Sequence, residues 1–187
     1  MLDDYLPDYD FSERHCRNVA ARPDTIIEAA SAYRAESDPF FRAMIGVREI
    51  PMRLAGWLGG RRAGLPPTFS LDNFTLLDRR DGSELVYGLV GQFWRSDFGL
   101  VSIADGTAFR AFDRPGIAKL VLGFSTEPGA GGLTKLTTET RIFCPDPVSR
   151  RKFAPYWYLI RPVSGLIRGR VLTSIRRASE KREAARR

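Results

Sequence analysis

The stretch DPVSRRKFAPYWYLIRPVSGLIRGRVLTSI, residues 146–175, decides the fold. Asp146 is a good N-cap, and Pro147 suits the first position of a helix. Steps of three and four residues place one series of side chains on a single side of that helix: Phe153, Trp157, Ile160, Ser164, Ile167, Val171 and Ile175. Because this series continues in phase past Pro162 and Gly165, we expect a kink there rather than an end. The stretch predicts a long amphipathic helix whose apolar side must be buried.

Extended segments precede this helix. In residues 9–19 the period of two places five side chains on one face: Phe11, Glu13, His15, Arg17 and Val19. Pro23 and Asp24 predict a helix over 23–35, and Asp38 followed by Pro39 predicts the start of a second helix. Turn residues separate the remaining strands, which we expect near 69–78, 84–94, 100–103, 109–112, 117–125 and 133–144.

This order of elements predicts an α+β fold. Consecutive hairpins imply an antiparallel sheet, and the sheet is the only partner large enough to bury the apolar side of the long helix. We therefore expect a curved antiparallel sheet of about six to seven strands wrapped around a long C-terminal helix, with two short helices after the first strand. Such an arrangement leaves a cavity between sheet and helix. We place one domain at residues 1–178 and a basic tail at 179–187.

Several strings resemble a bacterial branch of the START-like, or SRPBCC, superfamily. FSERHCRNVAARPD at 11–24 resembles its opening strand and helix start, and LVGQFWR (89–95), RPGIAKLVLGF (114–124), LTTETR (136–141) and FAPYWYLIRPVSGLIR (153–168) resemble later parts. The resemblance implies the helix-grip fold of the birch-pollen allergen and of polyketide cyclases. Members of the superfamily bind lipids, sterols or polyketides, and some are enzymes. The resemblance carries no catalytic residue over to this chain.

Composition and charge exclude several classes of protein. The 187 residues carry a net charge of +7, but eight Lys/Arg and two Glu from Arg168 onward account for most of it. The opening residues do not resemble a signal peptide, and no apolar run has the length of a transmembrane segment, so we expect a cytoplasmic protein.

Cys16 and Cys144 fit a reducing compartment, and we expect both to be small buried hydrophobic residues. One histidine and two scattered cysteines make a metal site improbable, and we expect no cofactor.

Glu13 and His15 are the first candidate site residues. His15 is the only histidine in the chain, so any histidine chemistry must use it. If their face of the strand points into the cavity, Glu13 beside His15 can transfer protons. The alternative is a hydrogen-bond network with a purely structural role.

The last strand and the long helix supply the other candidates. Leu136, Thr138, Thr140 and Ile142 share one face, which we expect to point inward, so that Thr138 and Thr140 orient a ligand; Glu139 and Arg141 should then form a solvated pair. We expect Trp94 on a central strand to meet Trp157 across the cavity, with Tyr156 beside it, as walls for a flat apolar ligand. Core packing explains these aromatic residues equally well.

Three functions remain open. The first is binding of a small apolar or amphipathic molecule, lipid-like or polyketide-like, in the cavity. The second is a cyclase, dehydratase or hydrolase with Glu13 and His15 as acid and base. The third is an interaction protein that uses residues 179–187 for weak contact with an anionic surface. We favour a solvated helix end for these residues and expect no nucleic acid partner, because they lack interleaved aromatic residues.

Overall fold

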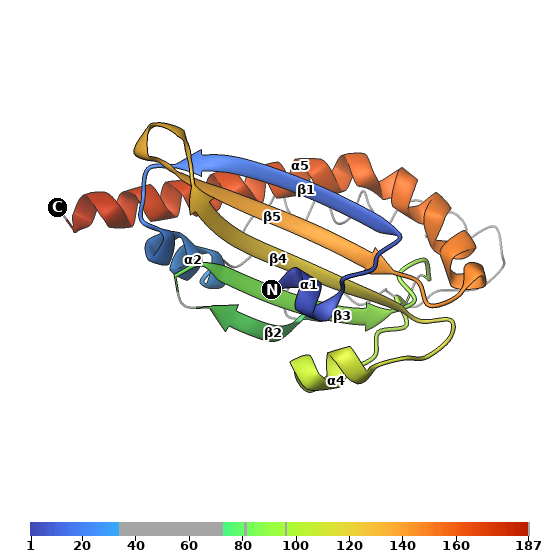
Figure 1. Ribbon diagram of the computed structural model, residues 1–187. Helices are drawn as coiled ribbons and strands as arrows, with labels where there is room; N and C mark the ends of the chain where they lie inside the picture. The colour runs from blue at the N-terminus through green and yellow to red at the C-terminus, as the bar shows by residue number, and fades with distance from the viewer. Residues whose placement is uncertain (34–72, 81, 96, 187) are drawn as a thin grey trace.

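A five-stranded antiparallel sheet and one long helix dominate the structure, a computed structural model that describes residues 1–33, 73–80, 82–95 and 97–186 (Figure 1). The strands lie in the order β1-β5-β4-β3-β2. The predicted α+β class, antiparallel sheet and long C-terminal helix are confirmed. The elements are α1 (Leu2–Tyr5), β1 (Phe11–Val19), α2 (Pro23–Ser31), β2 (Thr75–Arg80), β3 (Glu84–Gly91), α4 (Gly106–Ala111), β4 (Ala118–Pro128), η3 (Ala130–Gly132), β5 (Thr134–Phe143) and α5 (Pro147–Ala185).

The predicted count of six to seven strands is wrong for the described residues, where the sheet has five. The segment 109–112, expected to be extended, overlaps helix α4, because the Asp105 side chain accepts a hydrogen bond from the backbone N–H of Ala108 at 2.8 Å and caps that helix. The segment 100–103 contributes only a single bridge between Val101 and Val90. The helix predicted to start at Asp38 lies outside the described residues.

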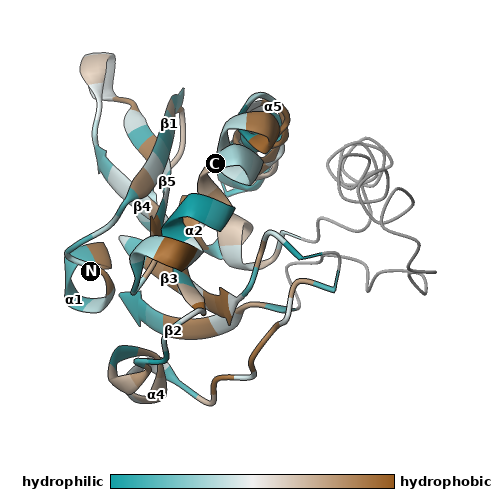
Figure 2. Ribbon diagram, turned by 90° about the vertical axis from the view of Figure 1, so that its right-hand side faces the viewer, coloured by the Kyte–Doolittle hydropathy of each residue, from teal (hydrophilic) through white to brown (hydrophobic). Residues whose placement is uncertain are grey.

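The two faces of the sheet bury different sets of elements. Figure 2 shows α5 and α1 on opposite sides of the sheet. On the α5 side, one cluster joins Leu85 and Leu136 of the sheet to Leu172 and Ile175 of α5. On the other side, residues of α1 and α4 pack against the outward side chains of β2, β3 and β4, among them Leu77, Val86 and Val121. The predicted apolar side of α5 is buried at Phe153, Trp157, Ile160, Val171 and Ile175.

Helix α5 begins where the sequence predicts. The Asp146 carboxylate accepts hydrogen bonds from the backbone N–H groups of Val148 and Ser149 at 2.9 and 2.8 Å. The helix continues through Pro155 and Pro162, and Figure 1 shows it curving along the sheet. Both prolines lie on the exposed side, seven residues apart. Because each proline lacks an N–H group and clashes with the preceding turn, the helix bends away from that side and toward the sheet.

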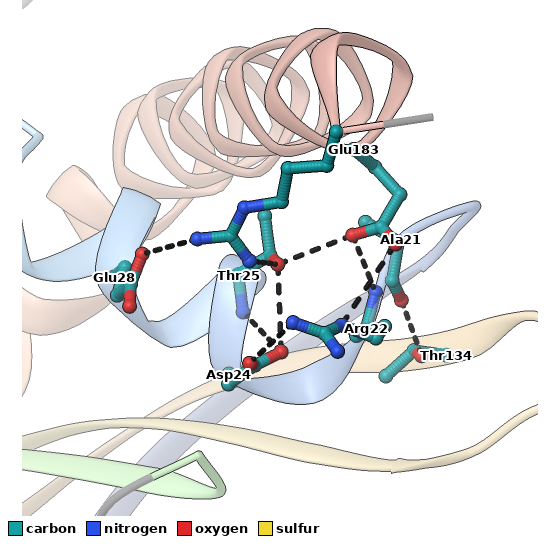
Figure 3. Close-up of polar contacts among 8 residues, drawn as sticks. Ala21, Arg22, Asp24, Thr25, Glu28, Thr134 and Glu183 are labelled. Carbon is teal, nitrogen blue, oxygen red and sulfur yellow. Dashed lines mark hydrogen bonds and ion pairs between the residues drawn. The ribbon is translucent and has the colours of Figure 1, made fainter.

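The C-terminal end of α5 is tied to the turn between β1 and α2 (Figure 3). The hydroxyl of Thr25 donates to Glu183 Oε2 at 3.1 Å, and the backbone N–H of Arg22 donates to the same oxygen at 3.4 Å. The backbone N–H of Ala20 donates to Glu180 Oε1 at 3.2 Å. Residues 179–185, which the sequence placed in a basic tail, therefore continue the helix and carry contacts to the rest of the fold.

We predict that the cap at Asp146 makes stability depend on acid pH. Hydrogen bonds, first from the backbone N–H of Ser149 and then from its hydroxyl, lower the pKa of Asp146 from 3.8 to about 2. Because the pKa of Asp146 is lower in the folded state than in the unfolded state, its carboxylate stabilises the fold fully at pH values above the unfolded-state pKa of 3.8. The stabilisation is then lost as the pH falls through about 2. Asp146→Ala should therefore melt earlier than the wild type at neutral pH, and the gap should close in acid.

Asp146→Asn is the control, because asparagine also caps helices but carries no charge. Thermal melting across this pH range should show most of the wild-type stability in Asp146→Asn at neutral pH. A constant gap between wild type and Asp146→Ala at all pH values would contradict the assignment.

The two cysteines differ in exposure. Cys144 is buried as predicted, and burial raises its pKa to about 12. The prediction for Cys16 is wrong: its side chain points away from the α5 side of the edge strand β1 and is exposed.

We expect a thiol reagent at mildly alkaline pH to modify only Cys16 in the folded protein, and both cysteines in denaturant. Loss of the fast reaction in Cys16→Ser would confirm the assignment, whereas rapid modification of Cys144 would contradict it.

Candidate functional site

The register of β1 and β5 brings four of the predicted site residues together. Glu13 is paired with Thr140, and His15 with Thr138. Residues directly opposite each other in an antiparallel pair point to the same face of the sheet. For these four it is the face covered by α5, where Glu13, Thr138 and Thr140 are buried and His15 is partly exposed. The predicted inward face of β5 is therefore confirmed.

Glu13 is held between a histidine and an arginine. Its Oε1 lies 2.8 Å from His15 Nε2, so that the imidazole donates a hydrogen bond to the carboxylate. Its Oε2 lies 3.8 Å from Nε of Arg168 on α5. The arrangement links the edge strand to the middle of the long helix through one buried carboxylate.

Gly165 makes room for this pair. A Cβ at position 165 would lie 3.2 Å from Glu13 Oε1 and 3.6 Å from His15 Cε1. The absence of a side chain therefore lets α5 approach β1 directly above the carboxylate. Sequence reasoning assigned Gly165 to a kink and missed this role. A glycine inside a helix, where it is unfavourable, was the available signal.

Three buried oxygens at this site make no hydrogen bond within the described residues. They are Glu13 Oε2, Thr138 Oγ1 and Thr140 Oγ1. Leaving such a group unsatisfied costs about 1–3 kcal/mol. Together they form a polar band across the interface between sheet and helix. An apolar cluster around Phe153 and Trp157 lies on one side of the band, and one around Leu136 and Ile175 lies on the other.

A small cavity of about 60 Å³ adjoins this band. Arg168 and Thr140 supply polar groups to its wall, and Phe93, Leu122, Tyr156 and Trp157 supply apolar and aromatic ones. Ligand pockets for drug-sized molecules measure roughly 300–1,000 Å³. The cavity therefore has room for a group of only a few heavy atoms.

The predicted pairing of Trp94 with Trp157 is wrong. Strand β3 ends at Gly91, and Trp94 lies in the turn that follows. The turn starts there because the backbone N–H of Arg95 bonds back to the carbonyl of Gln92 at 2.8 Å. The ring of Phe153 contacts both indoles instead, at centroid distances of 6.4 Å to Trp94 and 6.0 Å to Trp157. Tyr156 and Trp157 line the cavity, and their role as walls for a ligand stays a prediction.

The pair Glu139 and Arg141 lies on the opposite face, as predicted, but it is not solvated. Arg141 Nε donates to Glu139 Oε1 at 2.7 Å, and another guanidinium nitrogen donates to the carbonyl of Leu6 at 3.2 Å. Arg141 also forms an ion pair with Asp3 of α1. The N-terminal segment covers this face, and sequence analysis did not predict a helix there. The pair has a structural role.

The described part of the chain offers neither a metal site nor a membrane span. No three residues among its histidines, cysteines, aspartates and glutamates are grouped as a metal site would require. None of its helices combines the length and apolar character that a membrane crossing needs.

Comparison with known proteins assigns no family. No protein-family model matches the sequence, and no curated protein matches it. One solved structure, the protein TTHA0849 from Thermus thermophilus, aligns over 94% of this chain and 98% of its own, with 11% sequence identity and a TM-score of 0.29. A similarity at this level supports no conclusion about fold or function.

We predict that two glycines of α5 respond differently to alanine. A Cβ at Gly169 would meet nothing within 4 Å, so Gly169→Ala should stabilise the protein by about 0.5–1 kcal/mol through helix propensity. Gly165→Ala gains the same propensity, but its methyl group presses on Glu13, so its net effect should be smaller or destabilising. Urea unfolding of both variants measures the difference. An equal gain in both would contradict the close contact at Gly165.

Proposed function

We propose that this protein binds a small amphipathic molecule between the sheet and α5. The observation that carries the proposal is the set of three buried oxygens without hydrogen-bond partners in the described structure, at Glu13, Thr138 and Thr140. All three lie on one face of the sheet: Thr140 lines a cavity with apolar walls, Glu13 lies opposite Thr140 on β1, and Thr138 lies two residues from Thr140 on β5. A few convergent polar groups in an apolar cavity are typical of small-molecule sites. A ligand with a hydroxyl or amine group would donate to Glu13 and place its apolar part against Trp157.

The fold supports a ligand site at the same location. We infer that the five-stranded antiparallel sheet and the C-terminal helix form a helix-grip fold of the START-like superfamily, whose members enclose ligands between sheet and helix. The sequence strings at 11–24 and 153–168 that resemble the superfamily contribute Glu13 and Trp157. Because the cavity measures about 60 Å³, we expect it to take a small ligand or one small end of a larger ligand.

Native mass spectrometry of gently purified protein tests the proposal. We expect a mass above that of the chain, and extraction into denaturing solvent should release a molecule that carries a hydrogen-bond donor. Binding of that molecule to stripped protein should change the fluorescence of Trp157, and this change should be lost in Trp157→Phe. A bare chain mass, together with no thermal shift from a panel of short alcohols and amines, would overturn the proposal. Ordered water alone would then satisfy the three oxygens.

Thr138→Val and Thr140→Val should separate binding from stability. Valine removes a buried hydroxyl that has no partner, so each variant should be as stable as the wild type or more stable by about 1 kcal/mol. Affinity for the extracted ligand should fall. The matched control is Thr134→Val on the same face of β5: Thr134 donates to the Ala21 carbonyl at 2.7 Å, so its loss should destabilise by about 1 kcal/mol. Urea unfolding and ligand titration of the three variants supply both measurements.

A second candidate function is proton transfer, and the contact between His15 Nε2 and Glu13 Oε1 at 2.8 Å favours it. A carboxylate that orients an imidazole is a common arrangement for general acid–base catalysis. We expect His15→Gln to retain binding of the extracted molecule. If wild-type protein converts that molecule and His15→Gln does not, the site is catalytic. If neither converts it, binding alone is the function.

A further inference from the structure

Helix α5 carries a second apolar surface, on its solvent side. Tyr158, Leu159 and Leu166 are 65%, 56% and 61% exposed. Leu159 and Leu166 lie seven residues apart, which is close to two helical turns, so they share one side of the helix. That side points away from the sheet, because Trp157 and Ile160 are buried between α5 and the sheet. Tyr158 keeps an edge contact with Phe11 of β1, at a centroid distance of 6.5 Å, whereas core packing does not account for the exposed Leu159 and Leu166.

The same helix is strongly basic. From Pro147 to Ser179 it contains eight Lys/Arg and no Asp or Glu. Among the described residues, Arg151, Lys152, Arg161 and Arg177 belong to no ion pair and are exposed. At 100° per residue, Lys152 and Arg177 fall on the same side of the helix as Leu159. The exposed side of α5 therefore combines apolar side chains with positive charge along several turns.

We propose that this side of α5, defined by Lys152, Tyr158, Leu159, Leu166 and Arg177, docks on an anionic membrane surface. Positive charge alone would fit any polyanion, but exposed leucines contribute nothing to contact with phosphates or carboxylates in water. Leucine and tyrosine side chains instead enter the boundary between headgroups and acyl chains, while flanking Lys and Arg reach the anionic headgroups. The helix lies on the membrane and does not cross it. This inference is independent of the ligand site.

Co-sedimentation of the full chain with vesicles tests the surface. We expect binding to vesicles of phosphatidylcholine mixed with phosphatidylglycerol, and little binding to phosphatidylcholine alone. Added salt should weaken the binding, because exposed charges are screened.

A pair of double variants isolates the apolar contribution. Leu159→Glu with Leu166→Glu should lower partitioning into the mixed vesicles by about tenfold or more, with the melting temperature unchanged because both side chains are exposed. Leu76→Glu with Leu133→Glu is the matched control: these leucines are 49% and 37% exposed, and they lie on β2 and just before β5 instead of on α5. The control should partition nearly as the wild type does, although it carries the same added charge.

Three results would overturn the proposal. They are absence of binding to the mixed vesicles, equal partitioning of the two double variants, and retention on a polyglutamate resin without vesicle binding. The last result would assign the surface to an acidic protein partner. None of them bears on the ligand site, because all the substituted residues lie outside the cavity wall.

Discussion

The burial of one side of α5 against the sheet is the constraint on which the rest of this structure depends. Helix α5 has 39 residues, and most of the stability of a helix within a protein comes from tertiary packing of its apolar side and not from helix propensity. The local features of the helix serve that packing. Asp146 starts it at the edge of the sheet, and Pro155 and Pro162 curve it toward the sheet. Gly165 lets its middle come close to β1.

The polar band under Gly165 interrupts an otherwise apolar interface. Two apolar clusters on either side of it hold the helix in place, so the band does not have to contribute to stability. Glu13 has His15 of β1 and Arg168 of α5 as polar neighbours, whereas the hydroxyls of Thr138 and Thr140 have no hydrogen-bond partner within the described residues. An arrangement that leaves buried polar groups unsatisfied is unusual in folded proteins and more common where a site meets its ligand.

Periodicity in the sequence was enough to predict the elements that have one buried side. The apolar series of α5 and the alternation in β5 predicted their buried faces, and the alternation in β1 placed Glu13 and His15 on one face without deciding where it points, because burial imposes periods of 3.6 and 2 on the residues themselves. Periodicity was not enough to predict the short elements. Helix α4 depends on one capping contact at Asp105, and Trp94 falls outside β3 because a turn begins at Gln92. The role of Gly165 depends on a distance between chain segments that no local pattern records.

The strand order has a consequence for how the chain is made. Within the described residues, β1 pairs only with β5, and the two strands are separated by more than a hundred residues. During synthesis, β1 leaves the ribosome long before its partner exists, whereas short turns let β2 pair with β3 and β4 pair with β5. The apolar face of the growing sheet stays exposed to water until α5 has been synthesised. A nascent chain therefore passes through a stage in which exposed strand edges and bare apolar surface invite aggregation, and chaperones act on such species.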